Sequence, residues 1–233
     1  MFIVIEGIDG AGCETQAKNL SELLGHSGKR PSDSEGARPE SANNDSGVVA
    51  PLLPRMTNVS LIKYPDYDRN VGKLIKEFLY QNKDLTAEQQ FLLYTMQFIM
   101  DSQMIAEKRK NEIVIADRYF TTTLCYQTLE GVDMKMALDY AKNFKIEIPD
   151  MVFYLNVDPD IAIQRKGGED KEKNRREKDF EFIRRTHKQY DYLVKNQVWT
   201  KWINIDGNKC IEEITKDIYN KIINNKFLNI YYW

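Results

Sequence analysis

Cysteine and histidine are scarce in this chain of 233 residues, which has three cysteines and two histidines. The cysteines Cys13, Cys125 and Cys210 lie far apart, and their spacing matches no metal site. This spacing argues against a disulfide framework and fits a reducing compartment. His26 and His187 are too few and too far apart for a zinc site.

Neither sign of charge predominates, because 33 basic residues are balanced by 35 acidic ones and the formal net charge is −2. A protein that binds duplex nucleic acid normally presents a strongly basic face, so duplex nucleic acid is not an expected partner. No apolar run reaches the length that spans a membrane, and the chain begins with a strand pattern rather than a charged leader. We therefore expect a cytoplasmic protein without a membrane partner.

Aromatic side chains are missing from residues 25–57, a stretch rich in proline, serine, glycine, asparagine and aspartate. Such a composition cannot bury enough apolar surface to offset the entropy lost on ordering. We predict a flexible surface insertion there, within a single α/β domain that covers residues 1–233. The insertion is either a tolerated loop or a loop that binds a partner.

The rest of the chain alternates strand-like and helical patterns. Five short apolar runs predict strands, at residues 2–6, 59–63, 112–116, 151–157 and 201–205. Periodic stretches predict helices at residues 15–24, 70–81, 86–108, 122–129, 133–143, 158–165, 179–195 and 211–225. Thr86, followed by Gln89, resembles a helix capping box. Strands that alternate with helices predict a parallel sheet with helices on both faces.

A glycine-rich turn joins the first strand to the first helix, with the sequence Gly7-Ile8-Asp9-Gly10-Ala11-Gly12-Cys13-Glu14-Thr15-Gln16. A P-loop in this position directs backbone N–H groups at a phosphate, and the helix dipole favours the anion. The usual pattern, G-x-x-x-x-G-K-S/T, ends in a phosphate-neutralising lysine and a Mg²⁺-binding hydroxyl. Cys13 and Glu14 replace them. Two interpretations stay open: Glu14 occupies the anion site as a helix cap, or a metal ion lies between it and a phosphate.

Other conspicuous polar groups directly follow the predicted strands. They are Tyr64-Pro65-Asp66-Tyr67 after the second strand, Asp117-Arg118-Tyr119 after the third, and the charged run 166–178 after the fourth. Because ligands of parallel sheets bind outside the carboxyl ends of the strands, we expect these groups at one edge. Arg118 is expected to clamp a phosphate, with a salt bridge to Asp117 as the alternative. The charged run is either a solvated surface or a lid that brings arginines over phosphates.

Segments over nearly the whole chain resemble the thymidylate kinase family. They are residues 2–16, 64–75, 117–127 and 149–159, and the spacing D-R-Y-x-x-S/T-x-x-x-Y-Q within 117–127 is the specific signal. The resemblance implies a five-stranded parallel sheet with a small lid at about residues 166–178. It implies transfer of the γ-phosphoryl group of ATP to dTMP with Mg²⁺, in dTTP synthesis. It also implies a homodimer that forms through the region 70–108.

The resemblance further implies roles for individual residues. Asp9, Arg118 and the lid residue Arg175 would be catalytic. The ATP phosphates would contact Gly10, Ala11, Gly12, Cys13, Glu14, Thr15, Arg165 and Arg176. The acceptor dTMP would contact Asp9, Tyr64, Tyr67, Tyr94, Gln97, Arg118, Thr123, Tyr126 and Gln127. Among these, Tyr94 would stack on the base and Tyr126 would crowd the sugar 2′ position. Apart from the resemblance, our main hypothesis is that Glu14 helps to hold Mg²⁺.

Three residues depart from the family pattern, namely Cys13, Glu14 and Phe98, the last of which replaces an arginine that recognises the base. Ala11 stands where one branch of the family carries a P-loop arginine, so the resemblance favours the branch whose catalytic arginine comes from the lid. Arginines and lysines of the lid are expected to supply the charge that the turn lacks. The altered turn leaves open a nucleotide-binding protein without kinase activity. Phe98 leaves open a kinase for another pyrimidine monophosphate.

Overall fold

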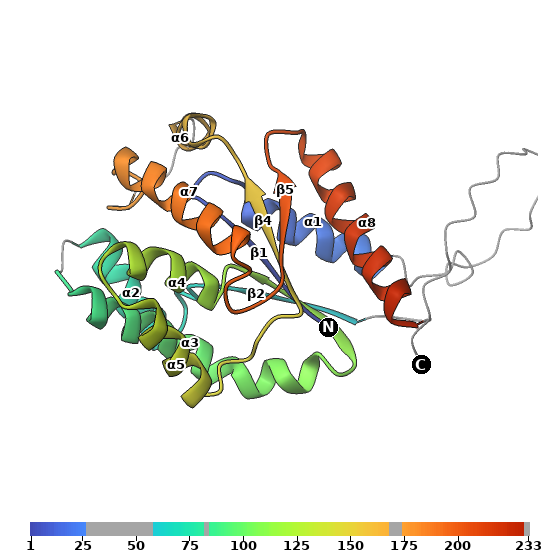
Figure 1. Ribbon diagram of the computed structural model, residues 1–233, viewed down its shortest axis with the longest axis horizontal. Coiled ribbons are helices and arrows are strands. Elements are labelled where there is room, and N and C mark those ends of the chain that lie inside the picture. Colours follow the sequence, from blue (N-terminus) through green and yellow to red (C-terminus); the bar gives the residue numbers. More distant parts are fainter. Residues whose placement is uncertain (27–57, 82–83, 168–173, 231–233) are drawn as a thin grey trace, which may run out of the picture.

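One parallel sheet of five strands forms the centre of the protein. The computed structural model describes residues 1–26, 58–81, 84–167 and 174–230, and the strand order within them is β2-β3-β1-β4-β5 (Figure 1). The strands are β1 (Phe2–Gly7), β2 (Asn58–Lys63), β3 (Glu112–Asp117), β4 (Met151–Asn156) and β5 (Trp202–Asp206). Each neighbouring pair is parallel, which confirms the predicted α/β class.

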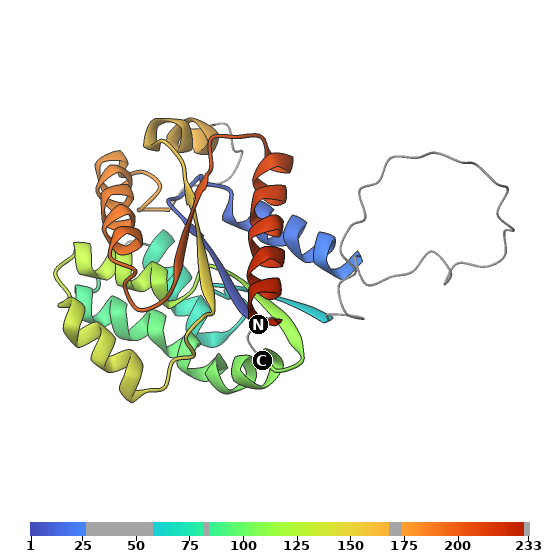
Figure 2. The ribbon, with the colours of Figure 1, turned by 45° about the vertical axis from the view of Figure 1, so that its right-hand side comes forward.

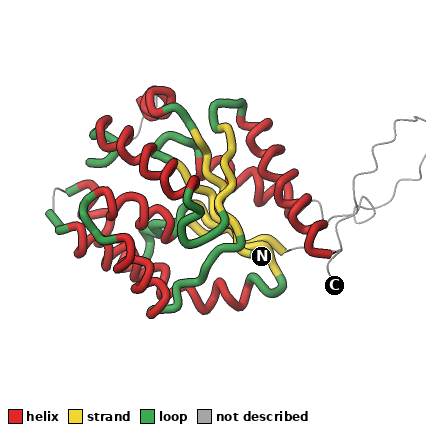
Figure 3. Tube along the Cα trace, viewed as in Figure 1, coloured by secondary structure: helices red, strands yellow, loops and turns green. Residues whose placement is uncertain are grey.

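Helices cover both faces of this sheet. They are α1 (Cys13–His26), α2 (Asn70–Tyr80), α3 (Ala87–Lys108), α4 (Phe120–Leu129), α5 (Met134–Asn143), α6 (Pro159–Gly167), α7 (Phe180–Lys195) and α8 (Ile211–Ile230). Helices α1 and α8 pack together on one face, and α3, α4 and α7 cover the other, as Figure 2 shows. Figure 3 shows the same layers, with the strands between the helices. All the predicted strands and helices are present, with ends shifted by up to five residues.

The central strands β1, β3 and β4 are mostly apolar because helices bury them from both sides, whereas the edge strands β2 and β5 are partly exposed. In β1, Phe2, Ile3, Val4 and Ile5 are completely buried. The capping box at the start of α3 is also confirmed, because Thr86 accepts the backbone N–H of Gln89 and the Gln89 side chain accepts that of Thr86. Residues 27–57 of the predicted insertion and residues 168–173 of the predicted lid lie outside the described residues, whereas residues 25–26, which we expected in the insertion, form the end of α1.

Glu6 is a fully buried carboxylate within the apolar strand β1. It accepts hydrogen bonds from the backbone N–H of Tyr119 at 3.1 Å and from the hydroxyls of Thr121 at 2.6 Å and Tyr190 at 2.8 Å. The hydroxyl of Thr122 also lies within 2.9 Å. Burial raises the pKa of Glu6, although Arg118 and these hydrogen bonds oppose the shift. Glu6 thus ties the beginning of α4, and α7 beyond it, to the strand that leads into the glycine-rich turn.

Candidate active site

The glycine-rich turn has the backbone conformation of an anion-binding loop. Gly10 and Gly12 have φ values of +90° and +92°, in the left-handed region that side chains disfavour. A Cβ atom on Gly10 would lie 2.3 Å from the carbonyl oxygen of Ala162 in α6, so this position also requires glycine for close packing. The turn ends where α1 begins, at Cys13. The N–H groups of the first helical turn are therefore available to a phosphate.

Cys13 and Glu14 have different environments. The thiol of Cys13 is buried, and burial raises its pKa, so it is neutral and not a nucleophile. Glu14 is exposed and accepts ammonium hydrogen bonds from Lys18 at 2.8 Å and Lys63 at 2.7 Å. These two bonds lower the pKa of Glu14 to about 2. Glu14 is therefore ion-paired with side chains rather than placed in the anion site, which disfavours the interpretation of Glu14 as a helix cap.

Arg118 reaches the turn from the end of β3. Its Nη2 lies 2.7 Å from Oδ1 of Asp9, and the hydroxyl of Tyr126 lies 3.4 Å from Oδ2 of the same carboxylate. Burial by itself would lower the pKa of Arg118, but Tyr126 and Asp9 offset this effect and the pKa is raised. The guanidinium stays charged, and its partner is Asp9 instead of the neighbouring Asp117 that the alternative interpretation favoured.

Strand register brings a further carboxylate to this edge. Asp117 pairs with Ile5 of β1 on one side and with Lys63 of β2 on the other. Its side chain is buried, and this burial raises the pKa of Asp117 to about 6, whereas the charges of Arg118 and Lys63 lower it. The carboxyl ends of three neighbouring strands therefore place an arginine, a lysine and a carboxyl group beside the glycine-rich turn.

Aromatic side chains form the other wall of the site. Tyr67 and Tyr94 are half-buried and belong to one apolar cluster with Phe78 of α2. The charges of Asp9 and Arg118 act on the phenol of Tyr67, and those of Tyr67 and Arg176 act on that of Tyr94. Burial raises the pKa of both phenols, so they remain neutral. The residues of α4 that are expected to contact dTMP, namely Thr123, Tyr126 and Gln127, are buried, and Tyr126 belongs to the main hydrophobic core.

Two of the residues that were expected to contact dTMP, Tyr64 and Gln97, already have hydrogen-bond partners within the protein. The Tyr64 ring is buried 4.9 Å from the ring of Phe98, and its hydroxyl donates to Asp101 at 2.7 Å. The Gln97 amide donates to the carbonyl of Asp66 at 3.0 Å and accepts the N–H of Asp66 at 3.3 Å. Both residues thus support the loop that carries Tyr67. Long-range partners of this kind leave no local signal in a sequence.

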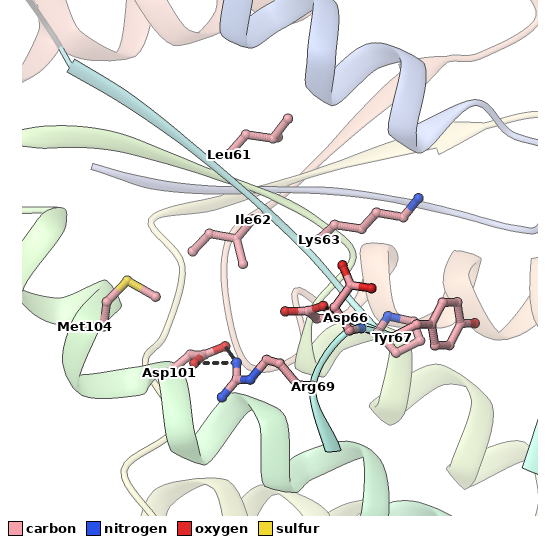
Figure 4. A pocket seen from close by; sticks show the side chains of 10 residues that line it. Leu61, Ile62, Lys63, Asp66, Tyr67, Arg69, Asp101 and Met104 are labelled. Atoms are coloured by element: carbon pink, nitrogen blue, oxygen red, sulfur yellow. Dashed lines mark hydrogen bonds and ion pairs between the residues drawn. The ribbon is translucent and has the colours of Figure 1, made fainter. Parts of the chain in front are cut away.

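Arg69 and Asp101 are site-lining residues that sequence reasoning missed. Arg69 donates to both carboxylate oxygens of Asp101, at 2.6 and 2.7 Å, and Figure 4 shows this ion pair across the loop after β2. It borders a pocket of about 520 Å³ between β2, this loop and α3. The sequence spacing could have identified Asp101, because it lies four residues after Gln97 and therefore on the same face of α3.

The three lid arginine candidates have separate partners. Arg175 lies over the ring of Phe78, with its Cζ 4.8 Å from the ring centroid, and pairs with the exposed Asp84 at 3.4 Å. Arg176 donates to Glu130 at 2.6 Å and to Gln90 at 2.8 Å. Arg165 donates to the carbonyl oxygen of Gly207 at 3.2 Å. The structure therefore does not gather these arginines on the glycine-rich turn.

The described residues contain no group of three or more histidine, cysteine, aspartate or glutamate side chains arranged to hold a metal ion. Glu14, the proposed Mg²⁺ ligand, already accepts from two ammonium groups and does not fit that role in this arrangement. Within the same part of the chain, no helix is both long enough and apolar enough to cross a membrane.

A parallel sheet whose first strand runs into a glycine-rich turn before a helix, with a charged arginine and tyrosines at the same edge, defines a P-loop nucleotide-binding protein of the nucleoside monophosphate kinase class. Comparison with known proteins narrows the class. A family model described as thymidylate kinase matches residues 47–218. The chain belongs to the thymidylate kinase family, which confirms the resemblance found in the sequence.

Relatives of almost the same length support this assignment. A probable thymidylate kinase of Methanococcus aeolicus is 27% identical over 232 residues, which cover 97% of this chain and 98% of the relative. A thymidylate kinase of Prochlorococcus marinus is 28% identical over 239 residues, covering 99% and 95%. A solved structure of thymidylate kinase from Candida albicans matches with a TM-score of 0.67 and 22% identity, covering 97% of this chain and 92% of that one, and it supports the fold.

Proposed function

We propose that this protein transfers the γ-phosphoryl group of ATP to the 5′-phosphate of dTMP, as a step of dTTP synthesis. Family membership supports the reaction class, and the contact between Arg118 and Asp9 beside the glycine-rich turn carries the assignment of the site. Phosphoryl transfer needs positioned reactants and electrostatic stabilisation rather than a protein nucleophile. The charged guanidinium at a strand end and the neutral thiol of Cys13 agree with that requirement.

On the acceptor side, Arg118 would exchange part of its contact with Asp9 for the 5′-phosphate of dTMP. Tyr67 stands beside this pair, and Tyr94 offers an aromatic face to the base. Tyr126 is packed with its hydroxyl toward Asp9, where a ring of this size leaves little room for a 2′-hydroxyl. The acceptor would therefore be a deoxynucleotide.

On the donor side, the phosphates of ATP would lie on the N–H groups of the turn and the first turn of α1. Arg175 is the proposed lid cation for the transferred group. Its ion pair with the highly exposed Asp84 is long, at 3.4 Å, and such pairs contribute little stability. Arg175 can therefore leave this partner for a phosphate at little cost, whereas Arg176 is held by Glu130 and Gln90.

Mg²⁺ would enter with ATP and be bound mainly by phosphate oxygens and water, as this ion prefers. Because Glu14 is paired with two lysines, we propose that Asp117, at the end of β3 beside the glycine-rich turn, is the protein carboxylate that faces the ion. When bound, the ion supplies positive charge to the phosphates during transfer. We also propose that the reaction takes place in the cytoplasm, in line with the free cysteines Cys13, Cys125 and Cys210.

We propose that two copies of the chain pair through α3. This helix exposes an apolar stripe with a spacing of four residues, at Leu92, Met96, Met100 and Met104, whose exposed fractions are 36–56%. A second copy would bury this stripe in a symmetric contact. Light scattering should show a dimer for the wild type and a monomer for Met100→Lys. The matched variant Met136→Lys, at an exposed methionine of α5, should stay dimeric; dissociation of both variants alike would contradict the assignment.

The reaction is tested by ADP formation from Mg²⁺-ATP with dTMP, dUMP, CMP or no acceptor. We expect dTMP-dependent turnover, and a loss of about 100-fold or more in Arg118→Met and Arg175→Met, because each removes positive charge from the transferring group. Lack of turnover in protein that still binds dTMP would reject kinase activity. Preference for another pyrimidine acceptor would reject the proposed substrate, and near-wild-type rates in both variants would reject the proposed residues.

A further inference from the structure

The glycine-rich turn lacks the lysine that neutralises phosphate in the usual pattern, and a carboxylate follows directly. Glu14 alone would repel a phosphate at the beginning of α1. The structure shows two ammonium groups on this carboxylate, from Lys18 and Lys63. One carboxylate with two ammonium groups has a net charge of +1, which is the charge that a lysine and a serine would supply. The positive charge missing from the turn is therefore present beside it.

The two lysines approach Glu14 from different directions. Lys63 is the last residue of β2, and Figure 4 shows its side chain extending away from Asp101 and Arg69, toward α1. Its Nζ lies 2.7 Å from Oε2 of Glu14. Lys18 lies four residues further along α1, so its backbone is about 6 Å more distant from the helix N-terminus.

Lys63 also belongs to the strand edge at which ligands of parallel sheets bind. It pairs in register with Asp117, and its charge acts on the buried Asp117 carboxyl. The Lys63 side chain is about half exposed, so a ligand can reach it. An ammonium has three N–H donors, and the contact with Glu14 uses one. Two donors therefore remain for other oxygens.

We propose that Lys63 is the phosphate-binding cation of this P-loop, supplied by β2 in place of the lysine absent at position 13, and that Glu14 holds its ammonium group toward the bound ATP. This inference rests on the proposed function for the identity of the nucleotide. It gives Glu14 a physical purpose as a positioning residue. It also differs from the expectation that arginines and lysines of the lid replace the missing charge.

Calorimetric binding of ATP without an acceptor tests the inference, because the measurement requires no turnover. Lys63→Met should weaken ATP binding about 10- to 100-fold, as expected for loss of a charge-assisted hydrogen bond. The matched variant Lys18→Met removes the other ammonium group on Glu14. It should also weaken ATP binding, but less than Lys63→Met does, because Lys18 begins further from the glycine-rich turn. Affinity for dTMP should be unchanged in both. Equal effects of the two variants, or unaltered ATP affinity in Lys63→Met, would overturn the proposal.

Two further variants separate charge from folding. Lys63→Arg keeps the cation and should bind ATP better than Lys63→Met, with the same thermal unfolding as the wild type. Cys13→Lys in the Lys63→Met background should regain ATP affinity, because it returns the cation to the usual position of the motif. Failure of Lys63→Arg to exceed Lys63→Met would count against a role for charge.

Failure of this inference can be distinguished from failure of the proposed kinase reaction, because ATP binding and dTMP phosphorylation are measured separately. Lys63-dependent ATP binding in a protein that does not phosphorylate dTMP would support this inference and reject only the reaction. Absence of ATP binding in the wild type would overturn the inference itself.

Discussion

Removal of the Arg118 guanidinium should reduce stability as well as activity, because it leaves the Asp9 carboxylate without its cation. The two side chains are 17% and 19% exposed and 2.7 Å apart. Exposed ion pairs contribute about 0.2–1 kcal/mol, whereas breaking a buried one costs about 3–5 kcal/mol. The ion pair between Arg118 and Asp9 is partly buried, so its contribution to stability should lie between these two ranges. We expect Arg118→Met to lower the free energy of unfolding by about 2–3 kcal/mol.

A double-mutant cycle isolates the contact. Arg118→Met, Asp9→Asn and the double variant should show a coupling energy of about 1–2 kcal/mol in urea unfolding followed by circular dichroism. Arg184 and Asp160 provide the matched control, because their ion pair has a similar length of 2.8 Å but exposed fractions of 42% and 72%. Its coupling should be below about 1 kcal/mol and should weaken more strongly with salt.

The reasoning would be refuted by a coupling between Arg118 and Asp9 no larger than that of the exposed control. Arg118→Lys adds a test of geometry, because it keeps the charge but not the planar fork of donors. It should recover part of the stability lost in Arg118→Met while its rate of dTMP phosphorylation remains low.

Three further perturbations test the surroundings of the site. Gly10→Ala places a Cβ atom 2.3 Å from a backbone oxygen and should abolish ATP binding in calorimetry, whereas Gly131→Ala, at a φ of +110° with open space around it, should keep it. Glu6→Ala leaves four donors without an acceptor and should cost more than about 3 kcal/mol in urea unfolding. Glu6→Gln keeps an acceptor and should cost clearly less; equal losses would show that these hydrogen bonds contribute little. Because burial raises the pKa of Asp117 from 3.8 to about 6, ionisation disfavours the folded state, and stability should fall as pH rises across that interval. Asp117→Asn removes this dependence. The free energy of unfolding of this variant, relative to that of the wild type in melting experiments, should therefore increase between pH 4 and pH 7 by an amount on the order of 2 kcal/mol. A difference that does not change with pH would contradict burial as the cause of the pKa shift.

Local sequence patterns determined the secondary structure of this protein and the position of its glycine-rich turn. The five apolar runs, the helical periodicities and the capping box at Thr86 specify their elements through interactions between near neighbours in the chain, and all are present. The glycine-rich turn was also readable, because the unusual φ values of Gly10 and Gly12 follow from residue type. Alternation of strands and helices then placed Arg118 and Tyr67 at the same edge of the sheet.

Tertiary structure decided which charges meet. Arg118 pairs with Asp9, 109 positions away in the chain, instead of the adjacent Asp117. Glu14 meets Lys63 across 49 positions, and Gln97 holds the backbone of Asp66 instead of remaining free for a base. Such contacts depend on strand order and register, which bring distant residues within hydrogen-bond distance. A sequence determines which side chains are charged, but partners and burial follow from how the strands and helices pack.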